Sequence, residues 1–271
     1  MNNTLLERNI NNCPNYCKER ETISTSDDRL HLLEVDGLCP LCGNSLLGNK
    51  GKKTKLYQIA HIYPNSPTEN ERVILDGVSV LGENSESFQN KIALCLNCHK
   101  NYDFQKKLGE YNNLLNIKKQ LYNSDIVKAK LSSIDISENL EVLLRRIIEV
   151  DFSKMKPMEL RLNPLELKKK FSSSETLLKI KVTNYVTEYF LYLKKYFKNL
   201  EENNQLNFSC LATIIRLAYQ NSTELLKSKQ EVFDSLVDWL LTKTATNDRS
   251  CAEVVISYFV QNCEVFDEIT E

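Results

Sequence analysis

Glycine and proline are scarce in this 271-residue chain, which contains 7 glycines and 6 prolines. Sandwiches and barrels need frequent turns, and those turns are built largely from these two residue types. Their scarcity therefore favours a mostly helical fold over an all-β one. The length predicts one or two domains with enough residues to bury a core.

Long apolar runs are also missing. No stretch reaches the roughly 18 consecutive apolar residues that a membrane-spanning helix needs, which predicts no membrane span. Residues 1–15 are polar and lack the apolar core of a secretory signal, which predicts a cytoplasmic protein. The sequence has no glycine-rich phosphate loop, so we expect no ATP hydrolysis by a Walker-type site.

The sequence also lacks a strong excess of charge of either sign. Residues 1–130 contain 17 basic and 15 acidic side chains, a net +2, and the remaining residues contain 18 and 21, a net −3. Affinity for nucleic acid grows with the number of phosphates that basic residues neutralise. Neither half is therefore expected to bind nucleic acid strongly, and a role on DNA would need a partner that holds the protein there.

Cysteine, by contrast, is plentiful, with nine residues. Four of them form two CxxC pairs, which in a reducing compartment are typical metal ligands and suit one tetrahedral zinc: Cys39, Cys42, Cys95 and Cys98. Cys13 and Cys17 form a looser pair, which either packs in the core or makes a second metal site. We expect the others to be small buried hydrophobes: Cys210, Cys251 and Cys263.

Hydrophobic periodicity places short strands before the second CxxC pair and helices after it. Residues 56–62 alternate as a strand does, 73–80 are a candidate second strand, and a helix is expected from residue 96. The first thirty residues are polar and irregular, and the short helical segment that follows contains His31, which is expected to be partly exposed. Further helices are expected around a broken connector at 151–164: 111–122, 137–150, 174–199, 208–219, 229–241 and 250–260.

Three residues of a catalytic kind lie between or beside the cysteine pairs: His61, Asn90 and His99. A neutral imidazole can take a proton from a water molecule near pH 7 and so activate it for hydrolysis. A short ββα unit is too small to be held by its own core. Four thiolates on a closed, structural zinc can supply roughly 10–16 kcal/mol of apparent binding energy to its folding.

These residues and the cysteine pairs that bracket them resemble the zinc-knuckle HNH endonuclease family over about residues 38–103. The resemblance implies that His61 is the general base and that Asn90 orients the loop of the base by hydrogen bonds to backbone. It implies that His99 binds a catalytic divalent metal, Mg²⁺ or Mn²⁺, and that DNA is the substrate.

One position departs from the family pattern. Many members carry a metal ligand just before the base histidine, where this chain has Ala60, and His99 alone would hold a metal weakly. Asp103 lies one helical turn after His99 and is either a second ligand or a residue that caps or pairs on the helix, while Gln58 is a weaker candidate. Four lysines are candidate phosphate contacts: Lys52, Lys53, Lys55 and Lys100. For the first three, which lie in a lysine-rich turn, the alternative is an ordinary solvated loop.

The helical half carries a second resemblance. Residues 236–240, 251–252 and 256–269 resemble the C-terminal domain of bacterial ABC three-component systems, and the likeness covers about residues 140–271. Those systems resemble Lamassu-type antiphage defence, in which an effector carries a variable N-terminal enzyme on such a tail. The implied partners are an SMC/Rad50-like ABC ATPase and a small accessory subunit.

The sequence thus predicts a mostly helical α+β protein. A ββα-metal nuclease domain with a structural zinc is expected at 1–125, and an all-α docking domain at 126–271. The predicted function is metal-dependent cleavage of DNA by the effector of an ATPase-gated defence complex. Two alternatives stay open: a stand-alone HNH nuclease of a restriction system or mobile element, and a non-enzymatic zinc-knuckle adaptor that binds nucleic acid.

Overall fold

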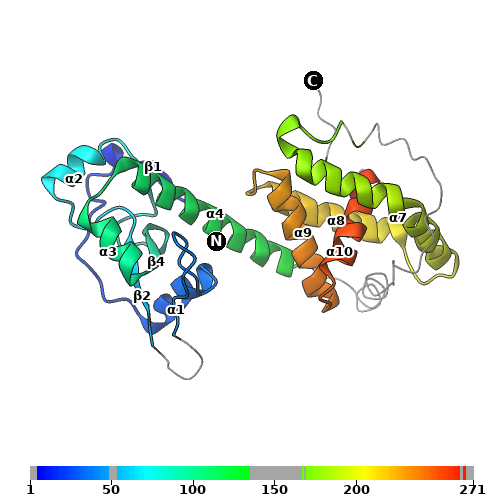
Figure 1. The fold of residues 1–271 in the computed structure, drawn as a ribbon, viewed down its shortest axis with the longest axis horizontal. Helices are drawn as coiled ribbons and strands as arrows, with labels where there is room; N and C mark the ends of the chain where they lie inside the picture. The colour runs from blue at the N-terminus through cyan, green and yellow to red at the C-terminus, as the bar shows by residue number, and fades with distance from the viewer. Residues whose placement is uncertain (1–4, 49–53, 135–166, 168, 263–264, 267–271) are drawn as a thin grey trace. The chain divides into compact units, whose positions relative to one another are not determined.

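A computed structural model gives the fold, and it describes residues 5–48, 54–134, 167, 169–262 and 265–266. These residues form a mostly helical α+β fold, as the sequence predicts (Figure 1). The chain divides into two compact units, Met1–Ile126 and Val127–Glu271, and the division falls within the long helix α4 (Leu108–Ser132).

A ββα unit lies at the centre of the first unit. Strand β2 (Tyr57–His61) pairs antiparallel with β4 (Lys91–Cys95), in a register that sets His61 opposite Lys91. Every residue of β4 is buried. Helix α3 (Leu96–Phe104) follows β4 directly and contacts both strands, so the helix start is fixed by the end of the sheet.

A second small sheet corrects two expectations. Strand β1 (Glu7–Asn9) pairs antiparallel with β3 (Ser79–Leu81), so the first thirty residues are not all irregular. The segment 73–80 is not one strand, because helix α2 (Glu69–Ile74), begun by a capping box at Thr68, occupies its start. Both differences depend on a pairing between distant segments, which local periodicity does not reveal.

Helix α1 (Thr25–Glu34) turns two polar side chains inward. Glu34 accepts two hydrogen bonds of 2.6 Å from Nζ of the fully buried Lys118, and the ring of His31 stacks on Phe88 at 4.1 Å. His31 is 1% exposed, so the expectation of a partly exposed side chain is wrong. Partners far along the chain cover it.

The second unit is a helical bundle around α10 (Arg249–Gln261). Helices α7 (Thr176–Glu202) and α9 (Lys229–Thr244) contact α10, and α8 (Phe208–Thr223) packs on α9. All residues of α10 from Cys251 to Val260 are buried. Helix α7, preceded by the short 3-10 helix η4 (Ser173–Glu175), buries a stripe at helical spacing: Leu178, Val182, Val186, Phe190, Leu193, Phe197 and Leu200.

Two of the cysteines that were expected to be buried lie in the described helices of this unit. Cys251 is buried as expected, but Cys210 is exposed, because it lies outside the buried stripe of α8 that begins at Leu211. The expected helix at 137–150, the connector at 151–164 and Cys263 lie outside the described residues. Among the described helices, none combines the length and the apolar character that a membrane crossing requires.

A buried lysine closes the end of α10. Lys170 is 1% exposed, and its Nζ donates to the backbone oxygens of Val260 at 2.8 Å and Phe266 at 2.9 Å. Carbonyls at a helix C-terminus have no partner inside the helix, and a cation is favourable at that end. Lys170 therefore fixes the segment that follows α10.

We predict that Lys170→Met destabilises the second unit by roughly 1–3 kcal/mol, because it leaves buried carbonyls without a donor. The measurement is urea unfolding followed by the fluorescence of Trp239, the chain's one tryptophan, which is buried in this unit. Lys169→Met, at an exposed neighbouring position, is the matched control and is expected to change little. Equal unfolding midpoints for the two variants would contradict the assigned role of Lys170.

Candidate functional site

The two cysteine pairs meet beside the ββα unit. Cys39 and Cys42 lie in a tight turn that follows α1. Cys95 ends β4 and caps α3, where its sulfur accepts a hydrogen bond from the amide of Cys98. The four Sγ atoms all lie within 4.8 Å of one another.

This spacing fits a tetrahedral metal. Four thiolates at a Zn–S distance of roughly 2.3 Å stand roughly 3.8 Å apart from each other. The Sγ atoms of Cys42 and Cys95 are 3.7 Å apart. The four cysteines can therefore bind a metal such as zinc, and four sulfur ligands would leave no open position on it.

The pKa shifts of the cysteine thiols also support a metal site. Burial raises the pKa of the Cys98 thiol, and the sulfurs of Cys95, Cys42 and Cys39 raise it further. Burial also acts to raise the pKa of Cys39, but the backbone N–H groups of Cys95, Leu41 and Cys42 outweigh it, and this pKa falls to about 7. Four thiolates thus need a compensating cation, which a bound metal supplies.

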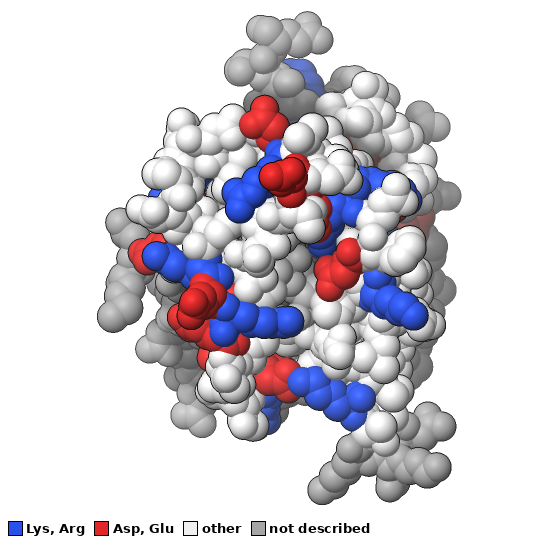
Figure 2. Space-filling model, turned by 90° about the vertical axis from the view of Figure 1, so that its left-hand side faces the viewer, with Lys and Arg blue, Asp and Glu red and all other residues white. Residues whose placement is uncertain are grey.

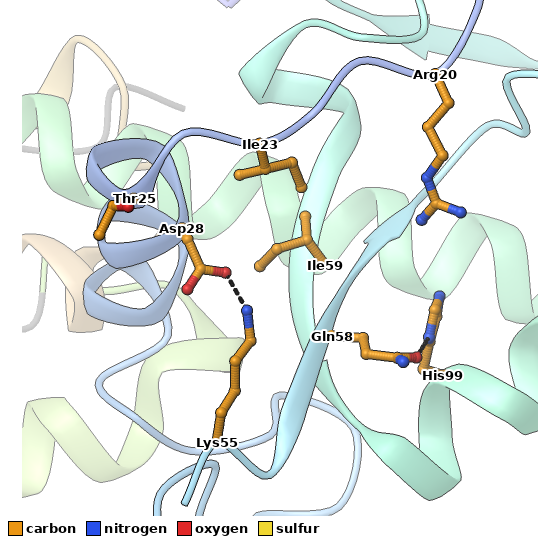
Figure 3. A pocket seen from close by; sticks show the side chains of 8 residues that line it. All are labelled: Arg20, Ile23, Thr25, Asp28, Lys55, Gln58, Ile59 and His99. Atoms are coloured by element: carbon orange, nitrogen blue, oxygen red, sulfur yellow. Dashed lines mark hydrogen bonds and ion pairs between the residues drawn. The ribbon is translucent and has the colours of Figure 1, made fainter. Parts of the chain in front are cut away.

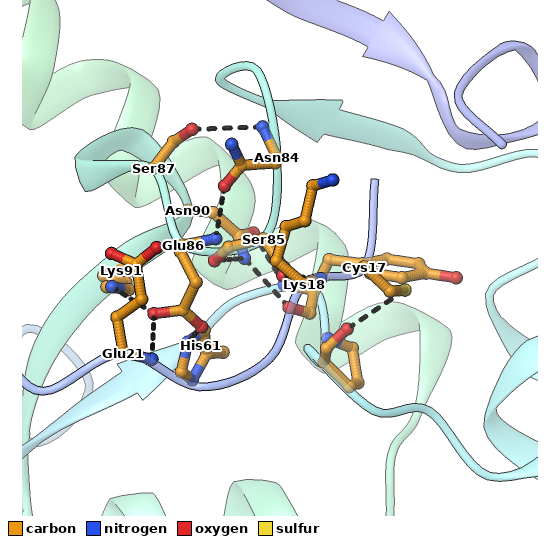
Figure 4. Close-up of polar contacts among 12 residues, drawn as sticks. Cys17, Lys18, Glu21, His61, Asn84, Ser85, Glu86, Ser87, Asn90 and Lys91 are labelled. Carbon is orange, nitrogen blue, oxygen red and sulfur yellow. Dashed lines mark hydrogen bonds and ion pairs between the residues drawn. The ribbon is translucent and has the colours of Figure 1, made fainter. Parts of the chain in front are cut away.

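His61 ends β2 and faces a buried carboxylate (Figure 4). Its Nε2 lies 2.7 Å from Oε1 of Glu86, whose other oxygen lies 2.6 Å from Nζ of Lys91. Burial lowers the pKa of His61, the Glu86 carboxylate raises it, and Lys91 and Arg20 lower it. Because the net shift is downward from 6.5, the ring is neutral at pH 7 and can accept a proton.

Asn90 is a fully buried clamp on the backbone around His61. Its Nδ2 donates to the backbone oxygens of Tyr63 and Ser85, both at 2.9 Å, and its Oδ1 accepts from the amide of Tyr63 at 2.9 Å. These bonds tie the chain just beyond His61 to the loop that carries Glu86. The position of the imidazole relative to that carboxylate is therefore held by a third residue.

His99 is held on both ring nitrogens. Its Nδ1 lies 2.6 Å from Oε1 of Gln58, and its Nε2 lies 3.1 Å from Oδ2 of Asp103. An amide oxygen only accepts, so Nδ1 carries a proton and donates to Gln58. In the neutral ring, Nε2 then has a lone pair that faces the Asp103 carboxylate oxygen. Two hydrogen-bond acceptors at 3.1 Å repel each other unless a proton or a cation lies between them.

The distance between these two acceptors suits an octahedral ion. Neighbouring ligands at roughly 2.1 Å from such an ion stand roughly 3.0 Å apart. Burial acts to raise the pKa of Asp103, but His99 and Lys106 outweigh it and lower it to about 2, so the group is anionic. Gln58 acts here as the partner that orients the imidazole, as the outer partners of metal-binding histidines do.

A hollow of about 400 Å³ opens beside His99 (Figure 3). In that view the guanidinium of Arg20 points toward His99. The charge of Arg20 also acts on His61, so this residue lies near both histidines. The hollow is lined by Arg20, Ile23, Thr25, Asp28, Lys55, Gln58, Ile59 and His99.

The predicted basic contacts are only partly described. Lys55 lines the hollow, where its Nζ pairs with Asp28 at 2.5 Å, and Lys100 is exposed on α3. Lys52 and Lys53 lie outside the described residues. Of the predicted basic contacts, Lys55 is thus the one at the hollow, and it is already paired with the Asp28 carboxylate.

The looser cysteine pair fits packing better than metal binding. Cys13 is buried, and the sulfur of Cys17 lies 3.8 Å from the backbone oxygen of Pro64. In the part of the chain that the structure describes, the four clustered cysteines form the group of three or more side chains that could hold a metal ion, and Cys13 and Cys17 are not members of it.

Sequence reasoning missed two residues of the site, Arg20 and Glu86. Both lie in irregular segments, where no periodicity marks a side chain as inward-facing. A partial signal existed, because pairing of the two strands brings Lys91 opposite His61 and a buried lysine needs a carboxylate partner. The sequence does not indicate which carboxylate this is, because Glu86 reaches Lys91 from a loop whose backbone is bound by Asn90.

Fold and site together define a chain in which a ββα unit, with a cysteine cluster that can bind a metal, precedes a bundle of helices. The family model of C-terminal domain 11 of the ABC-three component (ABC-3C) systems matches residues 127–266, which is more than half of the chain. The chain therefore belongs to this family, and the predicted resemblance of its helical half is confirmed. The comparisons with curated proteins and with solved structures gave no match.

We predict that Cys39→Ser or Cys95→Ser costs several kcal/mol and unfolds the first unit, because the metal-binding energy is part of its folding energy. Metal analysis of the unchanged protein should find at least one tightly held zinc per chain. Cys210→Ser is the matched control, since Cys210 is exposed on α8 and far from the cluster in sequence. A zinc-free protein that is folded at neutral pH would overturn this assignment.

Proposed function

We propose that the chain is a metal-dependent DNA endonuclease of the HNH type and the effector of an ABC three-component antiphage defence system. The observation that carries the nuclease proposal is the pair of acceptors, His99 Nε2 and Asp103 Oδ2, which lies beside a hollow bordered by Arg20. His61 lies three residues along β2 from Gln58, the partner of His99, which is roughly 10 Å in an extended strand.

Each side chain has a separate task in this reaction. The neutral imidazole of His61 takes a proton from the attacking water. The guanidinium of Arg20 holds a non-bridging phosphate oxygen, for which its planar donor fork is suited. Asn90 keeps the backbone beyond His61 in place, so that the imidazole does not turn away from the water.

The metal site uses the histidine and the carboxylate of α3. His99 and Asp103 would hold Mg²⁺ or Mn²⁺, and Gln58 keeps the lone pair of Nε2 directed at the ion. A bound divalent ion would stabilise charge on the phosphate and on the leaving oxygen. Ala60 gives no ligand, which suits an ion that retains several waters and takes one or two protein ligands.

The family and the charge distribution support the setting that we propose. Figure 2 shows a face of the first unit on which the basic and acidic side chains of the described residues are interspersed, so these residues form no continuous positive surface there for a DNA backbone. A nuclease unit of this kind binds DNA weakly at physiological salt. We propose that an SMC/Rad50-like ABC ATPase brings the cytoplasmic effector to DNA together with a small accessory subunit, through the ABC-3C domain.

We predict that His61→Ala keeps the fold and the zinc content and reduces plasmid cleavage at least about 10²-fold, the usual contribution of a general base. His99→Asn should also reduce cleavage and be partly rescued by raised Mg²⁺ or Mn²⁺, since it weakens metal binding, whereas raised metal should not rescue His61→Ala. Asn101→Ala, exposed on the same helix as His99, is the control. Undiminished cleavage by folded His61→Ala would remove the enzyme assignment and favour the adaptor.

We further predict that the full-length chain co-purifies with the ATPase and that the complex with ATP cleaves plasmid at least about tenfold faster than the chain alone. A tenfold factor corresponds to about 1.4 kcal/mol of added binding. The readout is the initial rate at physiological salt, with and without ATP. Equal rates for the chain alone and for the complex would replace this proposal with the stand-alone nuclease.

A further inference from the structure

A buried carboxylate and a buried lysine flank the proposed base, and the proposed mechanism gives them no role. The side chains of His61, Glu86 and Lys91 are 9%, 4% and 8% exposed. Glu86 also accepts a hydrogen bond of 3.2 Å from the amide of Glu21 on its Oε2. A buried charge is expensive unless it is paired, so this arrangement keeps Glu86 ionised only because three donors converge on it (Figure 4).

The ionised state of Glu86 determines the tautomer of His61. Burial acts to raise the pKa of Glu86, but Lys91, the amide of Glu21 and His61 outweigh it, and the net shift is downward. A carboxylate accepts only, so the 2.7 Å contact places a proton on Nε2 of the imidazole. The other nitrogen, Nδ1, is then the one with a lone pair.

The Nδ1 atom of His61 is open to a water molecule. The His61 side chain is 9% exposed, and among the described residues its Nδ1 is not one of the side-chain nitrogens that are fully buried without a hydrogen-bond partner. The imidazole ring of His61 makes its hydrogen bond through Nε2. The accessible and the anchored nitrogens of this ring are therefore different atoms, as general-base catalysis by a held imidazole requires.

We propose that Glu86, held in place by Lys91, is a positioning residue that fixes His61 in the Nε2–H tautomer and directs Nδ1 at the attacking water. This inference rests on the proposed nuclease function. In the step, the O–H bond of water breaks as its proton moves to Nδ1, and the water oxygen bonds to phosphorus as the P–O ester bond breaks. The imidazolium that forms stays paired with the Glu86 carboxylate, and the leaving oxygen takes a proton from solvent.

The test is Glu86→Gln in the full-length chain, read first by nitrogen NMR of the imidazoles, which is practical because the chain has three histidines. The groups that act on His61 are Glu86 from its loop, Lys91 from β4 and Arg20 from the segment before α1. Removal of the Glu86 charge leaves the two cations, so the pKa of His61 should fall and the Nε2–H tautomer should lose population. Glu83→Gln, an exposed carboxylate in the same loop, should change neither.

Cleavage gives the second readout. In Glu86→Gln we expect kcat to fall at least about tenfold with KM little changed, because an amide can also donate and so favours the wrong tautomer. The acid limb of the pH–rate profile should move to lower pH, following the fall in the pKa of His61. Lys91→Met removes a cation instead, and it should move that limb to higher pH, which gives a second test should Glu86→Gln not fold.

The role of Glu86 and the nuclease activity are contradicted by different results. An unchanged pKa and tautomer of His61 in folded Glu86→Gln would overturn the role of Glu86, whatever the cleavage rate. The expected NMR changes in a protein that cleaves no DNA, alone or in its complex, would overturn the nuclease proposal and with it the catalytic purpose of the pair. The NMR changes together with the kcat loss support both.

Discussion

The convergence of four cysteine sulfurs is the constraint on which the first unit depends. One pair lies in the turn after α1, and the other joins the end of β4 to the start of α3. A metal bound there would tie the turn, the strand and the helix together at one point. Since His99 directly follows Cys98, the same point determines where the proposed catalytic metal site lies relative to the sheet.

The two histidines of the site show how one residue type is prepared for two tasks. At His99 the partner of Nδ1 is a neutral amide, which leaves Nε2 directed at Asp103 and suits a cation between them. At His61 the partner of Nε2 is a buried carboxylate, which leaves Nδ1 as the basic nitrogen. The chemistry of each ring is thus decided by the group that occupies its other nitrogen.

Buried lysines recur in both units, and each has partners that justify its burial. Lys118 donates to Glu34 in the first unit, and burial lowers its pKa to about 8 even though Glu34 acts to raise it. Lys170 instead donates to backbone oxygens beyond α10. Both contacts join segments that are distant in sequence. For the Lys118–Glu34 ion pair, the contribution lies as much in fixing one arrangement as in net stability, since a buried ion pair can be replaced by apolar residues at little loss.

The sequence alone was sufficient to indicate the cysteine cluster, the short strand of His61, the helix that begins after Cys95 and the mostly helical second half, because each is marked by local spacing. The pairing of β1 with β3, the burial of His31, and the places of Glu86 and Arg20 were decided only by tertiary structure. Each depends on a contact between segments far apart in the chain. Such a contact leaves no local period: Glu86 lies in an irregular loop, and it faces His61 because Asn90 binds the backbone on both sides.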